Sequence, residues 1–529
     1  MTEPVQPPSE PFVPVAEVLR ERDERSWLGE PWSKSELLIL LLVTLAGGAL
    51  RLWHLEQWSL SNAEAELWRG ATEPLRGEQG FLASQRCNYP LGFLGLRWAL
   101  GSGLLLGQGE GWLRLPFAFI GTLCVPLLAL VGELFVARRA ALLAAALLAI
   151  HPWHLAASQT ASGEVLAGFF GLLGGGLLCI AHRTRGRRFG LLAAAAAFAA
   201  VAAHPSAWWT VVAVALVAAH ARSAPRWRTA ILAIAALLTV LLPIVALRWN
   251  ALTTQSASLV LPWLAELLDA VRPATWILAG AGFLAAASLA APSGSAAWGV
   301  GGRPGRRWLA AAAVLPLVAS ALLVAAGVPV APRTGVVALP ALLGAASVLV
   351  LGCFDRIAAQ LGGLRLASAL PAALLGAAFA ADLLVESFLH ATVHGGHRPD
   401  WRTARDAVLH AAGRVDRITV VAGEGYDSLV YYLRPNQWRD RTVDPHPGRV
   451  LFPMVADGLA IRDDLLQAAG RLSAVFLVLL RPEYEALQPD APARARLERQ
   501  FRVVAVAPSA FAAAEHTVYV LQLQVEAPR

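Results

Sequence analysis

Charged residues are scarce in this chain. Asp, Glu, Lys and Arg make up 15% of its 529 residues, whereas soluble proteins average about 25%. Hydrophobic residues make up 56% of the sequence, and the mean hydropathy is +0.53. This composition excludes an ordinary soluble enzyme and indicates a protein of the lipid bilayer. The long apolar runs lie between residues 35 and 389, while the remainder alternates charged and apolar residues, so two domains are predicted.

Cysteine is also scarce, and three of the four cysteines lie within apolar runs. A disulfide framework or a zinc site of known spacing is therefore excluded. Three histidines follow the apolar region, but two glycines interrupt their helical spacing and no cysteine or carboxylate cluster accompanies them. They are His390, His394 and His397. The sequence thus indicates no cofactor, and it leaves a divalent metal open.

The first 34 residues lack a long apolar core. A cleaved signal peptide needs such a core, so residues 1–34 are predicted to be a cytoplasmic segment before an uncleaved anchor. About eleven later runs approach the roughly 20 apolar residues that cross a bilayer as a helix. They are 36–53, 112–136, 140–157, 164–181, 190–203, 205–220, 230–247, 275–291, 308–326, 335–354 and 366–388.

Arginine clusters in short loops set the expected orientation. They are Arg138 and Arg139; Arg183, Arg185, Arg187 and Arg188; Arg222, Arg226 and Arg228; Arg303, Arg306 and Arg307; Arg356 and Arg365. Loops rich in Arg stay on the cytoplasmic side, and every cluster does so if the N-terminus is cytoplasmic. The positive charge, +7 overall, therefore reflects topology and gives no indication of nucleic-acid binding. We expect an integral protein of a bacterial inner membrane, with its C-terminal part outside the cytoplasm.

Two extramembrane regions are predicted. Residues 54–111 form a large outer loop, in which the apolar run 89–106 lies along the membrane interface. Residues 390–529 form a soluble α/β domain with helices at 402–412, 429–433 and 494–500, and strands at 418–422, 474–480, 503–506 and 518–523. The turn 423–426 has two glycines but lacks the third glycine and the lysine of phosphate-binding loops, so an ordinary turn is predicted.

Several short motifs occur in order along the membrane region. They are Asn62-Ala63-Glu64-Ala65-Glu66, Asn88-Tyr89-Pro90-Leu91, Gly109-Glu110-Gly111-Trp112-Leu113-Arg114-Leu115-Pro116, His151-Pro152-Trp153-His154, Ser158-Gln159 and Ala331-Pro332-Arg333. Together they resemble the polyprenyl-phosphate-sugar glycosyltransferases of the GT-C fold. That family includes the protein O-mannosyltransferases, the aminoarabinose transferase of lipid A and the RgtA/B/C/D-like enzymes. The resemblance implies a GT-C-like helical membrane domain over residues 35–389.

The first motif carries the catalytic expectation. The family has an Asp-Glu pair there whose Asp is the catalytic carboxylate, and Ala63 stands at the Asp position of this chain. Transfer from a polyprenyl phosphate needs a carboxylate to accept the proton of the acceptor hydroxyl. Glu64 is the first candidate for this base and Glu66 the second. The alternative is that both are solvated residues of an interfacial helix.

The remaining motifs supply candidate substrate-binding residues. They are Asn88, Arg114, His154, Gln159, Glu164 and Arg333. The two arginines lie at outer ends of predicted spans, where a guanidinium can bind the phosphate of a lipid carrier. The alternative for both arginines is anchoring to lipid headgroups or a structural ion pair, with Glu110 as the partner of Arg114. The alternative for His154, Gln159 and Glu164 is helix capping and solvation at the interface.

The sequence therefore predicts a glycosyltransferase. Its donor is a polyprenyl-phosphate sugar, and its acceptor is a lipid, a glycan or a protein at the outer membrane face. A catalytically degenerate GT-C relative, which binds a lipid carrier or a glycan as a scaffold, is the alternative because of Ala63. A transporter is disfavoured, since the chain has no internal repeat or paired broken helices.

Overall fold

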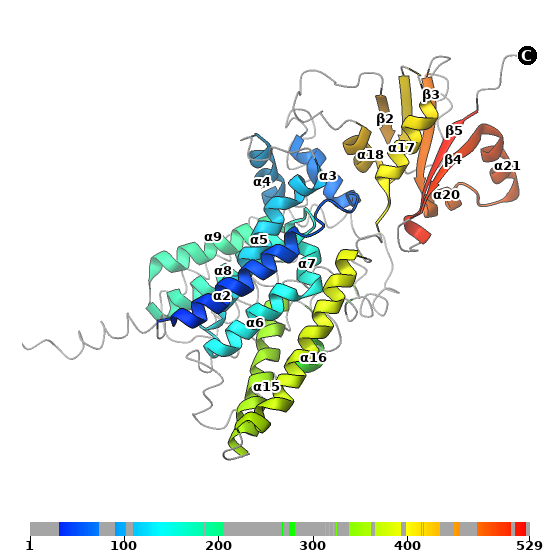
Figure 1. Cartoon of the computed structure of the whole chain (residues 1–529). Coiled ribbons are helices and arrows are strands. Elements are labelled where there is room, and N and C mark those ends of the chain that lie inside the picture. The colour runs from blue at the N-terminus through cyan, green and yellow to red at the C-terminus, as the bar shows by residue number, and fades with distance from the viewer. Residues whose placement is uncertain are drawn as a thin grey trace, which may run out of the picture.

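The computed structural model describes a bundle of apolar helices, two short helices at one end of it, and a C-terminal mixed β-sheet (Figure 1). The described residues are 31–72, 90–101, 109–184, 186–204, 275–280, 338–360, 365–392, 398–413, 417–433, 449–453, 473–508 and 514–524, with isolated positions 207, 267, 313, 317, 321, 324 and 415.

Eight helices of the described residues form the bundle. They are α2 (Lys34–Leu52), α5 (Glu110–Gly132), α6 (Arg138–Ile150), α7 (Pro152–Ser158), α8 (Gly163–Thr184), α9 (Arg187–Ala203), α15 (Leu339–Gln360) and α16 (Arg365–Thr392). Three of them contain a stretch long and apolar enough to cross a membrane, and the bent pair α6–α7 is a fourth if it counts as one span. The predicted span 230–247 lies outside the described residues, as do all of 205–220 except Ala207 and most of 275–291 and 308–326, so the total of eleven stays a prediction.

The predicted span 140–157 is divided into two helices, α6 and α7, which meet at an angle of 61°. The cause is Pro152, the first residue of α7, because proline disfavours helical backbone in the residue before it. His151 is extended and caps α7, since its ring nitrogen accepts the backbone N–H of Trp153 at 3.2 Å. An average of hydropathy over the whole run conceals this break.

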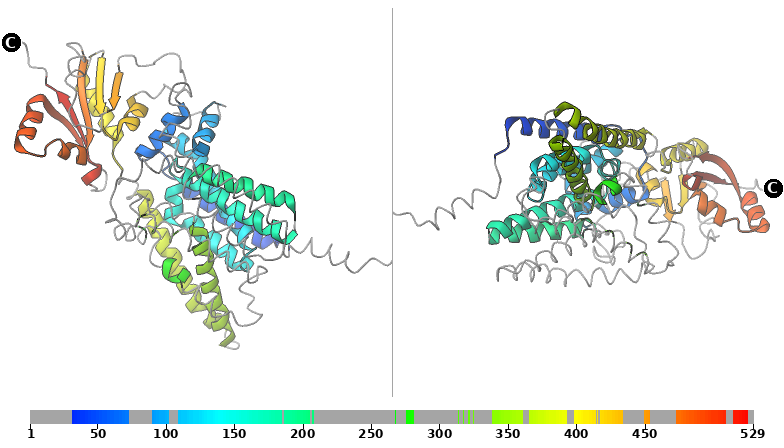
Figure 2. Two further views of the ribbon diagram at one scale, coloured as in Figure 1. Left: turned by 180° about the vertical axis from the view of Figure 1, so that it is seen from behind. Right: turned by 90° about the horizontal axis from the view of Figure 1, so that it is seen from below.

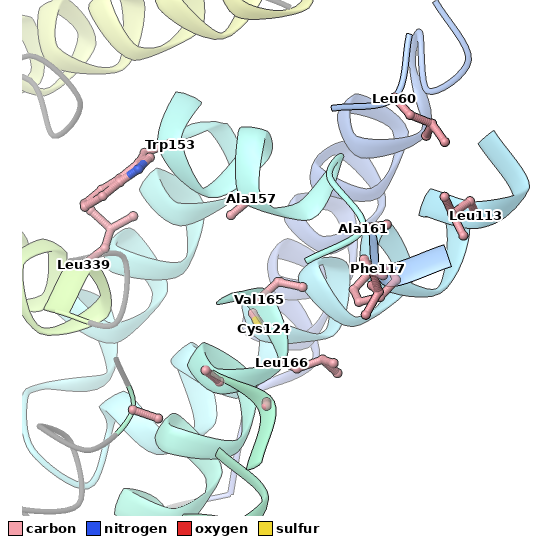
Figure 3. Close-up of a cluster of buried hydrophobic side chains, with 14 of the residues drawn as sticks. Leu60, Leu113, Phe117, Cys124, Trp153, Ala157, Ala161, Val165, Leu166 and Leu339 are labelled. Atoms are coloured by element: carbon pink, nitrogen blue, oxygen red, sulfur yellow. The ribbon is translucent and has the colours of Figure 1, made fainter. Parts of the chain in front are cut away.

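The short helices α3 (Asn62–Thr72) and α4 (Pro90–Gly101) lie between the bundle and the sheet (Figures 1 and 2). Leu60, Phe117 and Cys124 of α5, and Val165 of α8 come from three separate segments and share one buried cluster (Figure 3). The cluster fixes the start of α3 against α5 and α8. The end of the bundle that carries α3 is called the α3 end below.

The C-terminal region is built on a five-stranded sheet of order β2-β1-β3-β5-β4. Its elements are α17 (Trp401–Ala412), β1 (Arg417–Ala422), α18 (Tyr426–Leu433), β2 (Arg449–Pro453), β3 (Ser473–Leu480), α20 (Arg481–Ala486), α21 (Ala491–Gln500), β4 (Phe501–Ala507), η5 (Ala514–His516) and β5 (Val518–Leu523). Strands β2, β1 and β3 are parallel, whereas β5 is antiparallel to β3 and β4. The four predicted strands and three predicted helices coincide with elements of the structure, and β2 and α20 were not predicted.

Close packing against neighbouring side chains requires Gly423 and Gly425 in the turn from β1 to α18. A Cβ atom on Gly425 would lie 2.0 Å from the ring of Trp401. The backbone N–H of Glu424 donates to the Glu483 carboxylate at 2.7 Å, and a Cβ on Gly423 would overlap that carboxylate. A carboxylate of the protein thus occupies the place that a phosphate would need in a phosphate-binding loop. The turn sets α18 against α3, which joins the sheet to the α3 end.

Candidate functional site

Glu64 lies in the first turn of α3 and is completely buried. Arg114 contacts it with a two-pronged hydrogen bond, Nε to Oε1 at 2.7 Å and Nη2 to Oε2 at 3.0 Å. Oε1 also accepts the backbone N–H of Ala161 at 3.0 Å. Oε2 accepts the backbone N–H and hydroxyl of Ser61 at 2.9 and 3.1 Å, and Nη1 of Arg398 at 3.0 Å. These six donors use the full acceptor capacity of a carboxylate, which is about four lone pairs.

The two arginines determine the charge of Glu64. Burial is the largest single effect and favours the neutral acid, but the charges of Arg114 and Arg398, with the hydrogen bonds to Arg114 and Ser61, outweigh it. The pKa of Glu64 is lowered to about 2. At neutral pH the residue is therefore a firmly held anion, and its oxygens are not available to take a proton from a substrate.

The hydrogen-bond donors of Arg114 are occupied as well. A guanidinium has five N–H donors, and besides the two on Glu64 this one donates to the carbonyls of Leu55, Trp58 and Ser59 at 2.9, 2.9 and 3.0 Å. All five donors are in use, so contact with a phosphate would require one of these bonds to break. The side chain anchors the backbone that precedes α3.

The sequence offered Glu110 as the partner of Arg114, and this is wrong. Glu110 Oε1 instead accepts Nε of Arg402 at 2.7 Å and the hydroxyl of Tyr432 at 2.8 Å. The same hydroxyl accepts the backbone N–H of Leu60 at 2.8 Å. Burial and the Glu110 charge raise the pKa of Tyr432, so it remains a neutral donor. Two arginines of the C-terminal region, Arg398 and Arg402, thus neutralise two buried carboxylates at the α3 end.

Glu66 and Ala63 flank Glu64 on α3. Glu66 is half-buried and Ala63 is exposed. Residues two apart on a helix lie on different faces, so Glu66 does not share the environment of Glu64. The position at which the resemblance places the catalytic Asp therefore carries an exposed methyl group.

His154 lies inside the bundle, against Arg51. Nη2 of Arg51 donates to Nδ1 of His154 at 2.7 Å, which makes Nδ1 the acceptor nitrogen because a guanidinium has no lone pair to offer. Arg51 is fully buried and also donates to the carbonyls of Gly47, Leu148 and Ala149 at 2.7 to 3.2 Å. The sequence did not single out Arg51.

Gln159 caps α2. Its Nε2 donates to the carbonyls of Leu50, Arg51 and Trp53 at 2.9 to 3.3 Å, and the last carbonyls of a helix need such donors. Glu164 is half-buried in the first turn of α8. The remaining candidates, Asn88 and Arg333, lie outside the described residues. Within the described ranges, His, Cys, Asp and Glu side chains form no group of three or more that could hold a metal ion.

A cavity of about 680 Å³ lies where α2 ends and α5 begins. It has a polar side formed by the segment after α2 and an apolar side formed by leucines and one tryptophan. The lining residues are Leu52, His54, Leu55, Glu56, Gln57, Gly111, Trp112 and Leu115. Arg114, in the turn of α5 between Gly111 and Leu115, links the wall of this cavity to Glu64 through the carbonyl of Leu55.

Sequence reasoning missed Arg398, Arg402, Tyr432 and Glu56. The two arginines had one available signal, since they follow the last predicted span on the outer side, where an arginine needs an acidic partner. Tyr432 and Glu56 have none, because their roles depend on segments far apart in the chain.

No protein-family model matches the sequence, and no curated protein matches it. Solved structures do. ArnT from Cupriavidus metallidurans bound to undecaprenyl phosphate aligns with 94% of this chain and 100% of its own, with a TM-score of 0.54 and 14% identity. The Archaeoglobus fulgidus oligosaccharyltransferase in its apo form aligns with 90% of this chain and 73% of its own, with a TM-score of 0.55 and 14% identity.

AglB, the oligosaccharyltransferase of A. fulgidus, in complex with an inhibitory peptide and a dolichol-phosphate, aligns with 89% of this chain and 72% of its own. Its TM-score is 0.53 and its identity 14%. These proteins are glycosyltransferases of the GT-C fold. At such low identity the likeness is one of fold, and it agrees with the motifs of the membrane region: the chain is a membrane protein with the GT-C fold.

Proposed function

We propose that the chain is a membrane glycosyltransferase, which moves a sugar from a polyprenyl-phosphate carrier to a lipid, glycan or protein acceptor at the outer membrane face. The observation that carries this proposal is the likeness to ArnT across 94% of the chain. ArnT was solved with undecaprenyl phosphate and AglB with a dolichol-phosphate. A shared fold alone does not define an activity, so the local chemistry has to agree with it.

The arrangement at the α3 end supports the proposal. Sugar transfer needs a prepared polar site beside the bilayer, because the carrier arrives through the lipid. Glu64 forms ion pairs with Arg114 and Arg398, and these contacts hold the segment before α3 next to an open cavity. In this proposal Glu64 positions the site and does not take the proton. Glu66 is the second carboxylate that the family motif offers.

The proposed topology follows the arginine distribution. Residues 1–34 are cytoplasmic, residues 35–389 cross a bacterial inner membrane about eleven times, and residues 390–529 form an extracytoplasmic α/β domain. The polar contacts of this domain with α3 and with the start of α5 favour an outer position for α3 and the cavity.

The second candidate is a scaffold that binds a lipid carrier or glycan without catalysis. Two observations favour it: Ala63 is exposed where the family has its Asp, and Glu64 has no acceptor capacity left. This candidate keeps the fold and carrier binding but predicts no sugar transfer.

The test is turnover by the full chain purified in nanodiscs. Radiolabelled polyprenyl-phosphate sugars are supplied with a membrane extract as the source of acceptors, and carrier release and acceptor labelling are followed together. Transfer above that of empty nanodiscs supports the enzyme. Carrier binding with no transfer supports the scaffold, and in that case Ala63→Asp tests whether only the carboxylate is missing. A protein that neither binds nor consumes any of the carriers contradicts both.

A further inference from the structure

Glu56 is a carboxylate of the cavity whose side chain lies directly against two glycines. A Cβ atom on Gly111 would lie 2.3 Å from Cγ of Glu56, and a Cβ on Gly109 would lie 2.8 Å from its Oε1. A Cβ at either position would require the Glu56 side chain to shift, because Cβ contacts below 3.0 Å are essentially never seen. The two glycines therefore leave open the space that the Glu56 carboxylate occupies.

The backbone behind this side chain is fixed. Arg402 donates to the carbonyls of Glu56 and Gln57 at 2.5 and 3.3 Å, while Arg114 holds the carbonyl of Leu55 on one side. His54 adopts a left-handed conformation with φ of 59°, which costs a non-glycine residue energy and occurs preferentially at functional sites. The segment is thus held in one unusual conformation with its polar side chains on the cavity.

Glu56 differs from Glu64 in how many hydrogen bonds its carboxylate already accepts. Glu64 accepts six hydrogen bonds and is buried, whereas Glu56 is exposed and its carboxylate accepts none from the residues that the structure describes. Its lone pairs are open to a ligand in the cavity. A proton acceptor needs such open geometry first and a suitable pKa second.

The rest of the cavity indicates the ligand. His54, Gln57 and Glu56 offer hydrogen bonds to hydroxyl groups, and the ring of Trp112 offers the flat apolar face on which sugars stack. Leu115 continues the apolar side along α5, into the part of the helix that spans the membrane. A molecule with a hydroxylated head and an apolar chain fits both sides.

We propose that Glu56 is the carboxylate that accepts the proton of the acceptor hydroxyl, and that the acceptor is a lipid with a sugar or other polyhydroxylated head seated in this cavity. This inference rests on the proposed transferase function. The hydroxyl oxygen attacks the anomeric carbon, the bond from that carbon to the phosphate oxygen breaks, and polyprenyl phosphate leaves with the electron pair. The hydroxyl proton passes to Glu56 and from there to water.

The first experiment compares turnover of wild type, Glu56→Gln, Gly111→Ala and the control Gly95→Ala, in which a Cβ meets nothing within 4 Å. Removal of a proton acceptor typically costs about 100-fold or more in rate. We expect Glu56→Gln to lose that factor in rate, with carrier affinity unchanged. We expect Gly111→Ala to lose rate by displacing Glu56, and Gly95→Ala to match wild type.

The second experiment tests the ligand without turnover. A photoreactive dodecyl glucoside and a dodecyl phosphocholine with the same reactive chain are crosslinked to the protein in nanodiscs, and labelled peptides are mapped by mass spectrometry. We expect the glucoside to label the segment around Trp112 at least ten times more than the phosphocholine, and Glu56→Gln to remove this preference.

The outcomes separate the two proposals. Wild-type turnover with full activity in Glu56→Gln overturns the role of Glu56 and leaves the transferase intact. Equal labelling by the two probes overturns the acceptor class. Absence of turnover in wild type, with selective glucoside labelling that needs Glu56, overturns the transferase and the proton transfer but supports the glycolipid site.

Discussion

The ion pair between Glu64 and Arg114 makes the sharpest prediction about stability. In Glu64→Gln the volume of the side chain is kept, but the guanidinium of Arg114 and the donor from Arg398 lose their anion. The pKa of Glu64 is about 2 in the folded protein against 4.5 for an unperturbed carboxyl, and at 1.36 kcal/mol per pH unit this difference is about 3 kcal/mol. Loss of one partner of a buried ion pair costs about 3–5 kcal/mol, which agrees.

Equilibrium unfolding in mixed SDS micelles, followed by tryptophan fluorescence, measures the change. We expect Glu64→Gln to lose about 3 kcal/mol at pH 7. The matched control, Glu56→Gln, removes a carboxylate that makes no hydrogen bond among the described residues, and it is expected to stay within about 0.5 kcal/mol of wild type.

The direction of this pKa shift sets how the free energy of unfolding changes with pH. Because the folded-state pKa of Glu64 is depressed, its contribution is complete above pH 4.5 and is lost as the pH falls toward about 2. Wild type is expected to lose about 3 kcal/mol more than Glu64→Gln over this interval. A variant as stable as wild type at pH 7, or with the same acid loss, would refute the assignment of Glu64 as a buried structural anion.

Three further substitutions probe the contacts of the C-terminal region. Arg402→Gln removes the cation that pairs with Oε1 of Glu110. We therefore expect added protease to cleave the chain before α17 at least ten times faster than in wild type. Tyr432→Phe removes a hydroxyl with two hydrogen bonds, and we expect a loss of about 1–3 kcal/mol in the same unfolding assay. Gly425→Ala places a methyl 2.0 Å from the ring of Trp401, and overpacking of this kind is expected to cost about 1–3 kcal/mol; an unchanged unfolding curve would contradict that packing.

The sequence predicted the described helices of the bundle well, because a run of about 20 apolar residues has few alternatives in a bilayer. The α/β pattern after residue 400 was also predictable, since strand and helix periodicities differ. The motifs pointed to Glu64 and Arg114 separately but did not predict that they bind each other. That pairing depends on the angle at which α3 meets α5, and no local pattern records it.

The partners from the C-terminal region were not predictable in the same way. Arg398 lies 334 residues from Glu64 and Arg402 lies 292 residues from Glu110. Glu56 was overlooked because the motifs drew attention to the next acidic residues along the chain. Its contact with Gly109 and Gly111 depends on how the segment after α2 packs against the start of α5, and no local sequence pattern records that packing.

The contacts of Arg398 with Glu64 and of Arg402 with Glu110 connect residues that are synthesised at very different times. A ribosome completes Glu64 and Glu110 long before it reaches Arg398 and Arg402, so the nascent membrane region carries two acidic side chains short of their final cations. The segment between α2 and α3 acquires these contacts only after the C-terminal region has been synthesised. The cavity wall, which Arg402 holds through the carbonyl of Glu56, is therefore completed late, and a chain interrupted after α16 lacks this contact.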